Sequence, residues 1–449
     1  MSGSPADPAL AGPALAGPVL AGTEAIAAVA AGALSVSDVV EGCLGRVAEL
    51  DPAIGAFRLV DEYGARGRAK ELDDRVAGPL QGLVAGVKDV IDTAGLPTGY
   101  GSALFADHQP AADADVVTAL RRAGAIVLGK TESTEFAMFA PTRTRNPVDL
   151  ARTPGGSSSG SAAAVAAGMV PVALGTQTAG SVVRPAAYCG VYGFKPAWGW
   201  TSTTGIWRLS RHLDTVGLFA RCVSDLLLTY QALRSPGEQA RSPYGDAAAA
   251  HPLGKPSVAV LRGQEWADCD GDVRDALSWV AGRLSDDGWA VREMTMPASW
   301  RHLPGQQEVV MAAEVAGNLH AALGDRVSQI SESAQAIVER GDRCLASEYL
   351  AGLEAKQEAL RTLAPLAATT DLVLTPSALG AAPAGLDYTG DPVMCRPWTL
   401  LGLPAANLPC WRRPDGLPVG VQLVGTGRDD LTYLTCLALA EAAVTHKED

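Results

Sequence analysis

Two stretches rich in glycine and hydroxyl side chains contain the residues best suited to chemistry. Residues 153–161 read Thr-Pro-Gly-Gly-Ser-Ser-Ser-Gly-Ser, and residues 175–185 read Gly-Thr-Gln-Thr-Ala-Gly-Ser-Val-Val-Arg-Pro. In the second stretch, Ser181 follows small residues whose backbone amides can converge on one point, as the donors of an oxyanion hole do. A serine becomes a nucleophile when a base removes its proton. The pattern indicates acyl transfer at a serine; the alternative is a Gly/Ser loop that only joins core elements.

The base is less clearly marked. Lys88, Lys130 and Lys195 are rival candidates, and their spacing does not choose among them. Each can act as a base only if burial keeps it neutral. Arg184 is the first charged residue after a long neutral stretch, and we expect a structural role for it in holding the loop after the nucleophile. Five apolar side chains are candidates to line an acyl pocket: Phe136, Met138, Trp198, Trp200 and Trp207.

Two other motifs suggest different chemistry. Residues 124–131, Gly-Ala-Ile-Val-Leu-Gly-Lys-Thr, match the phosphate-binding pattern G-x-x-x-x-G-K-[ST], but the apolar middle positions favour a buried strand over a turning loop. Residues 156–160, Gly-Ser-Ser-Ser-Gly, match the nucleophile elbow of α/β-hydrolases with Ser158 as nucleophile. That mechanism also needs an acid and then a histidine downstream, and none of the later histidines lies in an evident catalytic loop. We therefore keep a P-loop protein and a Ser-His-Asp hydrolase as weaker alternatives.

The elements that position these residues follow from periodicity. Residues 1–22 repeat Leu-Ala-Gly-Pro and predict a flexible tail before a domain over 23–449. Helical spacing over 24–75, with Ser35 or Ser37 as a cap, precedes a strand–helix–strand rhythm at 83–87, 115–123 and 125–128. A further helix is expected over 162–167, and residues 235–253 read as a loop between two lobes. Further strands are expected at 170–175, 257–261, 372–375 and 420–425, and further helices at 273–286, 308–323 and 347–362.

Composition narrows the class of protein. The 449 residues are 47 % hydrophobic and 19 % charged, a balance typical of a folded chain with a large core. The net charge of −13 argues against nucleic acid and anionic membranes as partners. Eight scattered cysteines without a Cys-x-x-Cys pair, and the absence of basic residues before Arg46, predict reduced thiols and a cytoplasmic location. The uncharged residues 153–183 are interrupted by Gly, Ser, Thr and Pro and do not read as a membrane span.

Several motifs together resemble the amidase signature family. They are Gly155-Gly-Ser-Ser-Ser-Gly-Ser161, Gly175-Thr-Gln-Thr-Ala-Gly-Ser181, Arg184-Pro-Ala-Ala-Tyr-Cys-Gly190, Gly193-Phe-Lys-Pro196, Gly82-Leu-Val-Ala-Gly-Val-Lys-Asp89 and Leu213-Asp-Thr-Val-Gly217. The resemblance is strong over about 79–225 and returns at 396–404 and 416–425, whereas 236–365 offers little to compare. Gln177 and Ala179 depart from the commonest family pattern, which has Asp and Gly there.

The resemblance implies a fold, an activity and a site. The fold is a single α/β domain, a large mixed sheet covered by helices on both sides. The activity is hydrolysis of the C–N bond of a linear amide, releasing ammonia or an amine through an acyl-enzyme, without cofactor or metal. The implied catalytic residues are Ser181 as nucleophile, Ser157 after a cis peptide bond as bridging serine, and Lys88 as base, with the backbone amides of Thr178, Ala179, Gly180 and Ser181 as the oxyanion hole.

Partners and the nearest alternative function are also implied by the resemblance. The expected ligand is a small-molecule amide, and a second copy of the chain is a candidate partner. The nearest alternative is the glutamine-hydrolysing component of a tRNA-dependent amidotransferase, which resembles amidases in its triad but delivers ammonia to a partner protein. Ammonia release from glutamine, measured with and without the partner proteins, separates the two.

Overall fold

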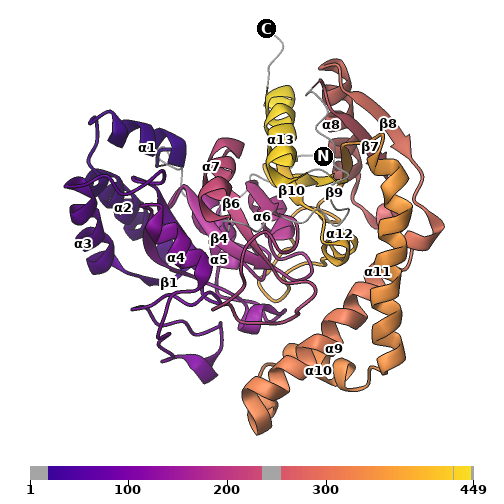
Figure 1. Ribbon diagram of the computed structural model, residues 1–449, viewed down its shortest axis with the longest axis horizontal. Helices are drawn as coiled ribbons and strands as arrows, with labels where there is room; N and C mark the ends of the chain where they lie inside the picture. The colour runs from indigo at the N-terminus through magenta and orange to yellow at the C-terminus, as the bar shows by residue number, and fades with distance from the viewer. Residues whose placement is uncertain (1–18, 235–253, 428, 446–449) are drawn as a thin grey trace, which may run out of the picture.

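A computed structural model of the protein describes residues 19–234, 254–427 and 429–445. Within these residues, the sheet at the centre of the molecule contains eleven strands (Figure 1). In sheet order the strands are β1 (Phe57–Val60), β3 (Ile126–Thr131), β2 (Val84–Lys88), β4 (Val172–Gln177), β6 (Thr215–Ala220), β5 (Tyr192–Lys195), β10 (Ala405–Arg412), β11 (Pro418–Gly425), β9 (Leu372–Pro376), β7 (Ser257–Leu261) and β8 (Ala290–Met294). β2 pairs in parallel with β3 and β4, and β7 pairs in parallel with β8 and β9. The remaining pairs are antiparallel, so the prediction of a mixed sheet in one domain is confirmed.

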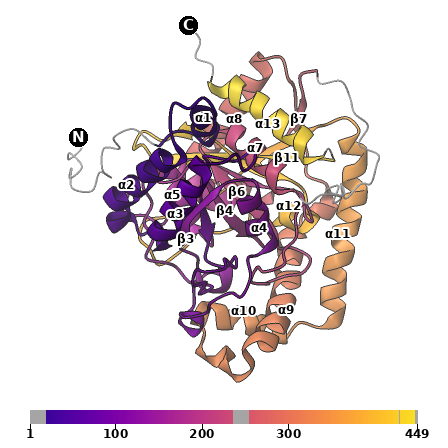
Figure 2. The same cartoon turned by 60° about the vertical axis from the view of Figure 1, so that its left-hand side comes forward.

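Helices cover both faces of the sheet (Figure 2). The helices are α1 (Gly22–Ala30), α2 (Val36–Ile54), α3 (Glu62–Asp73), α4 (Asp115–Arg122), α5 (Ser159–Ala166), α6 (Val183–Cys189), α7 (Val223–Leu233), α8 (Gly271–Asp286), α9 (Leu303–Leu323), α10 (Glu332–Asp342), α11 (Ala346–Ala367), α12 (Arg396–Leu401) and α13 (Asp430–Thr445). Side chains of β2 alternate between two apolar clusters: Val84 belongs to the cluster that includes side chains of α2, α3 and α5, whereas Ala85 and Val87 belong to the cluster that includes side chains of α4 and α7. Because successive strand residues point to opposite faces, this alternation shows a sheet buried on both sides.

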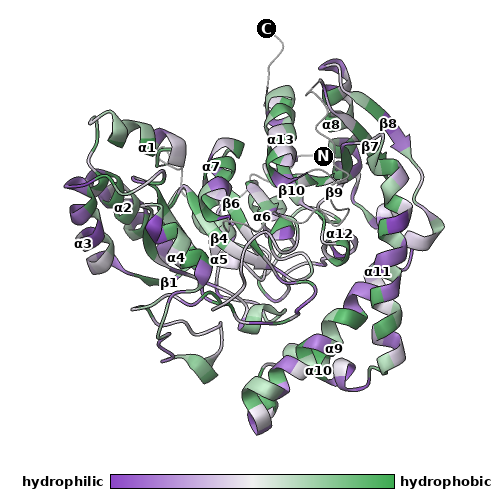
Figure 3. Ribbon diagram, viewed as in Figure 1, coloured by the Kyte–Doolittle hydropathy of each residue, from purple (hydrophilic) through white to green (hydrophobic). Residues whose placement is uncertain are grey.

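Three helices form an arm beside the sheet. α10 and α11 each pack on α9, and α12 contacts both α9 and α11. Figure 3 shows hydrophilic bands along α9 and α11, whereas the central strands are mostly hydrophobic. The arm is drawn from the part of the chain in which the sequence offered little resemblance to the family.

Most predicted elements are present within a few residues of their predicted bounds. β7 coincides with the predicted strand, and α2 begins with Ser35 as its cap, whose Oγ accepts a hydrogen bond from Asp38 N at 3.0 Å. Strand β1 was not predicted, because its four residues interrupt a long helical pattern. The predicted tail lies outside the described residues up to residue 18, and the predicted loop at 235–253 lies wholly outside them.

The phosphate-binding motif at 124–131 is not a phosphate-binding loop. Residues 126–131 form β3, and every residue of that strand is buried. A P-loop needs free backbone amides in a turn after its strand, so the motif match is coincidental. No helix in the described ranges is both long enough and apolar enough to cross a membrane.

Candidate active site

Lys88 and Ser157, far apart in sequence, meet beside the central strand β4. Lys88 is the last residue of β2, and its Nζ donates hydrogen bonds to Ser157 Oγ at 2.7 Å and to Thr176 Oγ1 at 2.8 Å. The peptide bond between Gly156 and Ser157 is cis, as the resemblance implies. Lys88 and Ser157 are completely buried. The parallel pairing of β2 with β4 brings the end of one strand beside Thr176 on the other.

The surroundings of Lys88 favour its neutral form. Burial lowers the pKa of the Lys88 ammonium well below its ordinary value, and the negative charge of Asp214 opposes this shift. Desolvation disfavours the charged amine because water no longer stabilises it. A neutral amine has a lone pair that accepts a proton, so Lys88 is equipped to act as a base on the Ser157 hydroxyl.

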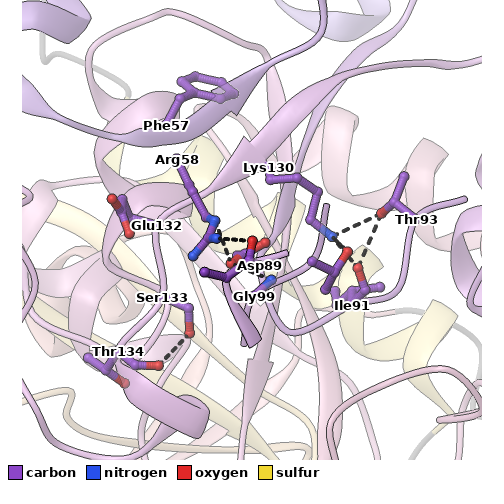
Figure 4. A network of polar contacts seen from close by, with 12 residues as sticks. Phe57, Arg58, Asp89, Ile91, Thr93, Gly99, Lys130, Glu132, Ser133 and Thr134 are labelled. Atoms are coloured by element: carbon purple, nitrogen blue, oxygen red, sulfur yellow. Dashed lines mark hydrogen bonds and ion pairs between the residues drawn. The ribbon is translucent and has the colours of Figure 1, made fainter. Parts of the chain in front are cut away.

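Lys130, the first rival base, belongs to a separate polar network (Figure 4). Its Nζ donates to the carbonyl of Ile91 and to the hydroxyls of Thr93 and Thr98, both at 3.0 Å. Burial lowers the pKa of Lys130 to about 8, against the attraction of nearby Asp89. None of these partners is a candidate nucleophile, so the network reads as internal support for the loop after β2.

Lys195, the second rival, makes no described hydrogen bond to a serine hydroxyl. Its Nζ donates to the carbonyl of Pro196 at 2.9 Å, and burial lowers the pKa of Lys195 to about 7. Among the three lysines, the described hydrogen bonds connect only Lys88 to a serine hydroxyl. The structure therefore separates candidates that sequence spacing left equal.

Ser181 lies in the turn between β4 and α6. The side chain is close to fully buried, at 7 % exposure, and its hydroxyl makes no hydrogen bond to another described residue. Residues 178–181 are here called the Ser181 loop. Their backbone N–H groups donate to no described group. Unpaired backbone donors beside a free hydroxyl are what an oxyanion hole requires.

The peptide planes of the Ser181 loop are held by their carbonyl oxygens. Three carbonyls of the loop each accept one hydrogen bond: Thr178 O from Gln307 Nε2 at 2.8 Å, Ala179 O from Thr399 Oγ1 at 2.7 Å, and Gly180 O from Arg184 N at 3.0 Å. A trans peptide points its N–H opposite to its C=O. These three bonds therefore fix the directions in which the N–H groups of Ala179, Gly180 and Ser181 point.

Two further contacts brace the same loop. Thr178 Oγ1 donates to Asp214 Oδ1 at 2.6 Å, and burial raises the pKa of Asp214 to about 6. Gln177 Oε1 accepts from Val182 N at 2.9 Å and Val183 N at 3.1 Å, at the start of α6. Gln177 thus supports the turn, although the family more often has Asp at its position.

We expected the Arg184 side chain to hold the loop after the nucleophile, but it contacts a different loop. Its Nη2 donates to the carbonyl of Gly156 at 2.6 Å, so the guanidinium binds the cis peptide that carries Ser157. Its Nε and Nη1 are buried without a described partner. The prediction of a structural role stands, but the residue acts on the other serine-rich loop.

The α/β-hydrolase alternative finds no support in the geometry. Ser158 is fully buried, and its Oγ pairs with the backbone of Thr176, accepting from N at 3.4 Å and donating to O at 3.3 Å. Within the described ranges no histidine hydrogen-bonds Ser158, and His446 lies outside them. In the same ranges no cluster of His, Cys, Asp and Glu is arranged to hold a metal.

The aromatic candidates divide between the site and the core. Trp207 stacks on Phe136, with ring centroids 4.7 Å apart, and lines a narrow cavity that reaches Thr176 and Thr178. Trp200 instead stacks on Tyr230 and donates its indole N–H to Val216 O, so it belongs to the core. Large aromatic residues near a sheet more often pack than contact ligand, and Trp200 follows that rule.

Sequence reasoning missed the residues that support the site. Thr176 and Asp214 lie inside quoted motifs, and Thr399 lies inside the range 396–404. The sequence therefore marked these positions but did not predict what their side chains do. Gln307 lies on α9, in the part of the chain that offered little resemblance, and the structure brings it to the Ser181 loop.

Comparisons with known proteins agree with the geometry of the site. Residues 38–434 match the family model described as Amidase. The A component of the Glutamyl-tRNA(Gln) amidotransferase of Geobacillus kaustophilus is 33 % identical, over 92 % of this chain and 95 % of its own. A crystal structure of an amidase, 28 % identical, superposes with a TM-score of 0.82 over 94 % of this chain and 98 % of its own. The substrate complex of 6-aminohexanoate cyclic dimer hydrolase, 25 % identical, has a TM-score of 0.82 and coverages of 95 % and 97 %.

Proposed function

The chain belongs to the amidase family and is an amide C–N hydrolase, and we propose that it works through an acyl-enzyme on Ser181. Ser157 is the bridging serine, Lys88 is the base, and the backbone amides of residues 178–181 are the oxyanion hole. The observation that carries the proposal is the 2.7 Å hydrogen bond between buried Lys88 and Ser157, beside a loop whose N–H groups are unpaired.

In the first half-reaction, Ser181 Oγ attacks the amide carbonyl carbon. Its proton passes to Ser157 Oγ, while the proton of Ser157 passes to the Lys88 amine. The carbonyl oxygen becomes negative and accepts hydrogen bonds from the backbone amides of residues 178–181. The C–N bond then breaks, Ser157 donates its proton to the leaving nitrogen, and ammonia or an amine departs. Lys88 returns its extra proton to Ser157 and becomes neutral again.

In the second half-reaction, water attacks the acyl carbon. Lys88 and Ser157 remove its proton, and the oxyanion is held by the same amides. The bond to Ser181 Oγ breaks, and the serine recovers its proton together with release of the carboxylic acid. Because Lys88 starts and ends neutral, the cycle needs no other titrating group.

The test is turnover of a panel of aliphatic, aryl and amino-acid amides, with release of ammonia or amine as the readout. We expect the wild type to hydrolyse at least one class and Ser181→Ala to lose about a millionfold in kcat, as when a catalytic serine that acts as a unit with its base is removed. The variant should fold, because the Ser181 hydroxyl bonds no described residue. Retention of more than about a tenth of the wild-type rate contradicts the assignment.

A second candidate function is glutamine hydrolysis within an amidotransferase. It is favoured by the 33 % identity to the amidotransferase component of Geobacillus kaustophilus. Ammonia release from glutamine that requires added partner proteins supports it, whereas turnover of simple amides by the chain alone supports a free-standing amidase. Pairing of two copies and a cytoplasmic location remain predictions, which light scattering and cell fractionation test.

A further inference from the structure

Two neighbouring cavities lie beside the site and share part of their lining. The outer cavity, of about 290 Å³, is lined by Trp198, Thr201, Trp207, Arg208, Arg211 and Asp214 among others. The inner cavity contains Thr176 and Thr178 and shares Trp207 and Asp214 with the outer one. Thr176 bonds Lys88, and Thr178 begins the Ser181 loop. The outer cavity is therefore linked to the reacting centre by residues that line both cavities.

The outer cavity has free hydrogen-bond donors. Arg208 and Arg211 are exposed, and neither guanidinium makes a hydrogen bond or ion pair with another described residue. The indole Nε1 of Trp207 is buried without a described partner. A buried donor without an acceptor is unfavourable, and Trp207 lines both cavities.

The carboxylates nearby are already occupied by donors. Asp214 accepts from Thr178 Oγ1, Leu209 N and Ser210 N, at 2.6, 2.9 and 3.0 Å. Glu314, on α9, accepts from Ser210 Oγ, from the His212 backbone and ring, and from Tyr349 Oη. A third cation, Lys356, lies over the Trp198 ring at 5.7 Å. Of these charged groups, Arg208 and Arg211 are thus the two whose hydrogen-bonding capacity no described residue uses.

Resting on the proposed function, we propose that the outer cavity binds a carboxylate of the amide substrate. Arg208 and Arg211 supply the charge, and Trp207 forms a wall common to the two cavities. Arginine suits a carboxylate because its planar fork makes two parallel hydrogen bonds. The substrate class is an amide that carries an acid group on its acyl part or on its amine part.

The experiment compares kcat/KM for matched pairs of anionic and neutral amides. Adipamate with hexanamide places the carboxylate on the acyl part, and N-acetylglycine with N-propylacetamide places it on the amine part. We expect at least about a tenfold preference for the anionic member of one pair, the scale of a charge-assisted hydrogen bond. The preference should weaken with added salt, because the arginines are exposed.

The variant that tests the cavity is the double substitution Arg208→Gln with Arg211→Gln. It should lose most of the preference and leave the neutral amide within about twofold of wild type, since neither arginine braces the fold. Arg75→Gln is the matched control, an exposed arginine beyond α3 that lines neither cavity. A preference that survives the double substitution, or equal rates for both members of both wild-type pairs, overturns the proposal.

A binding measurement keeps this result separate from failure of the proposed function. If the wild type hydrolyses no amide of either pair, the proposed function fails, and calorimetric titration with adipate and with neutral adipamide then tests the cavity. Binding of adipate that the double variant loses supports the carboxylate site. Equal binding of adipate by wild type and double variant, or no adipate binding, overturns it.

Discussion

Gln307→Glu should lower kcat while leaving KM and the fold nearly unchanged. Gln307 is completely buried on α9; its Nε2 donates to Thr178 O at 2.8 Å, and its Oε1 accepts from Arg396 Nη1 at 2.7 Å. An ionised glutamate has the same shape and still accepts from Arg396, but it cannot donate to Thr178 O. The substitution therefore removes one anchor of the Ser181 loop and preserves the rest.

The magnitude follows from the number of anchors. Removing an oxyanion donor outright costs about a hundredfold to a thousandfold in kcat. Gln307→Glu leaves all the N–H groups present but releases the peptide plane of one, so we expect a loss of about tenfold to a hundredfold, or about 1.4–2.7 kcal/mol in the activation free energy. The loss belongs to kcat because the oxyanion forms only in the transition state.

The assay is steady-state turnover of one amide by the wild type, Gln307→Glu and a control. Gln306→Glu is the matched control, because Gln306 precedes it on α9 and its side chain bonds no described residue. Thermal unfolding of all three proteins checks the fold. A kcat within about twofold of wild type, or a change confined to KM, refutes the argument that α9 orients the Ser181 loop.

Three further substitutions separate catalysis from stability. In the wild type, the rate should rise with pH around a midpoint below the pKa of an ordinary lysine, about 10.4, because burial lowers the pKa of Lys88. For Lys88→Met we expect loss of turnover and of this basic limb of the pH profile. A wild-type profile in the variant contradicts this. For Lys130→Met the limb should remain. Because the pKa of Lys130 is about 8 in the fold, unfolding takes up a proton between that pH and about 10.4, so the free energy of unfolding rises with pH there, and urea titrations should show a smaller rise in the variant. Ser35→Ala should cost about 1 kcal/mol in the same titrations with kcat unchanged, since it removes the cap of α2; an unshifted midpoint speaks against it.

The sequence predicted the fold where local pattern and burial agree. The apolar runs at β2, β3, β4 and β7 have few other ways to be buried, so their strands were predicted within a few residues. β1 was missed because four residues between two helices are too short to show alternation, and its pairing with β3 is a long-range contact. Periodicity reports neighbours along the chain, whereas strand order depends on contacts between distant segments.

The residues of the site also divide into those that the sequence predicted and those that it did not. Lys88, Ser157 and Ser181 were named because motifs carry them, and resemblance, not spacing, preferred Lys88 to Lys130. The structure adds the physical difference: Lys88 bonds a serine hydroxyl, and Lys130 bonds threonines and a carbonyl. The sequence did not predict the contact of Gln307 with the Ser181 loop, because that contact depends on where α9 lies in the fold.

The most direct test of the account is covalent labelling with a serine-directed fluorophosphonate, read by intact mass and peptide mapping. An activated hydroxyl beside an oxyanion hole attacks the phosphorus, the P–F bond breaks with loss of fluoride, and the serine oxygen keeps the phosphonyl group. We predict a single adduct on the peptide that contains Ser181, and no adduct in Ser181→Ala. An adduct on the peptide segment with Ser158, or unchanged labelling of Ser181→Ala, would contradict the assignment of Ser181 as the nucleophile.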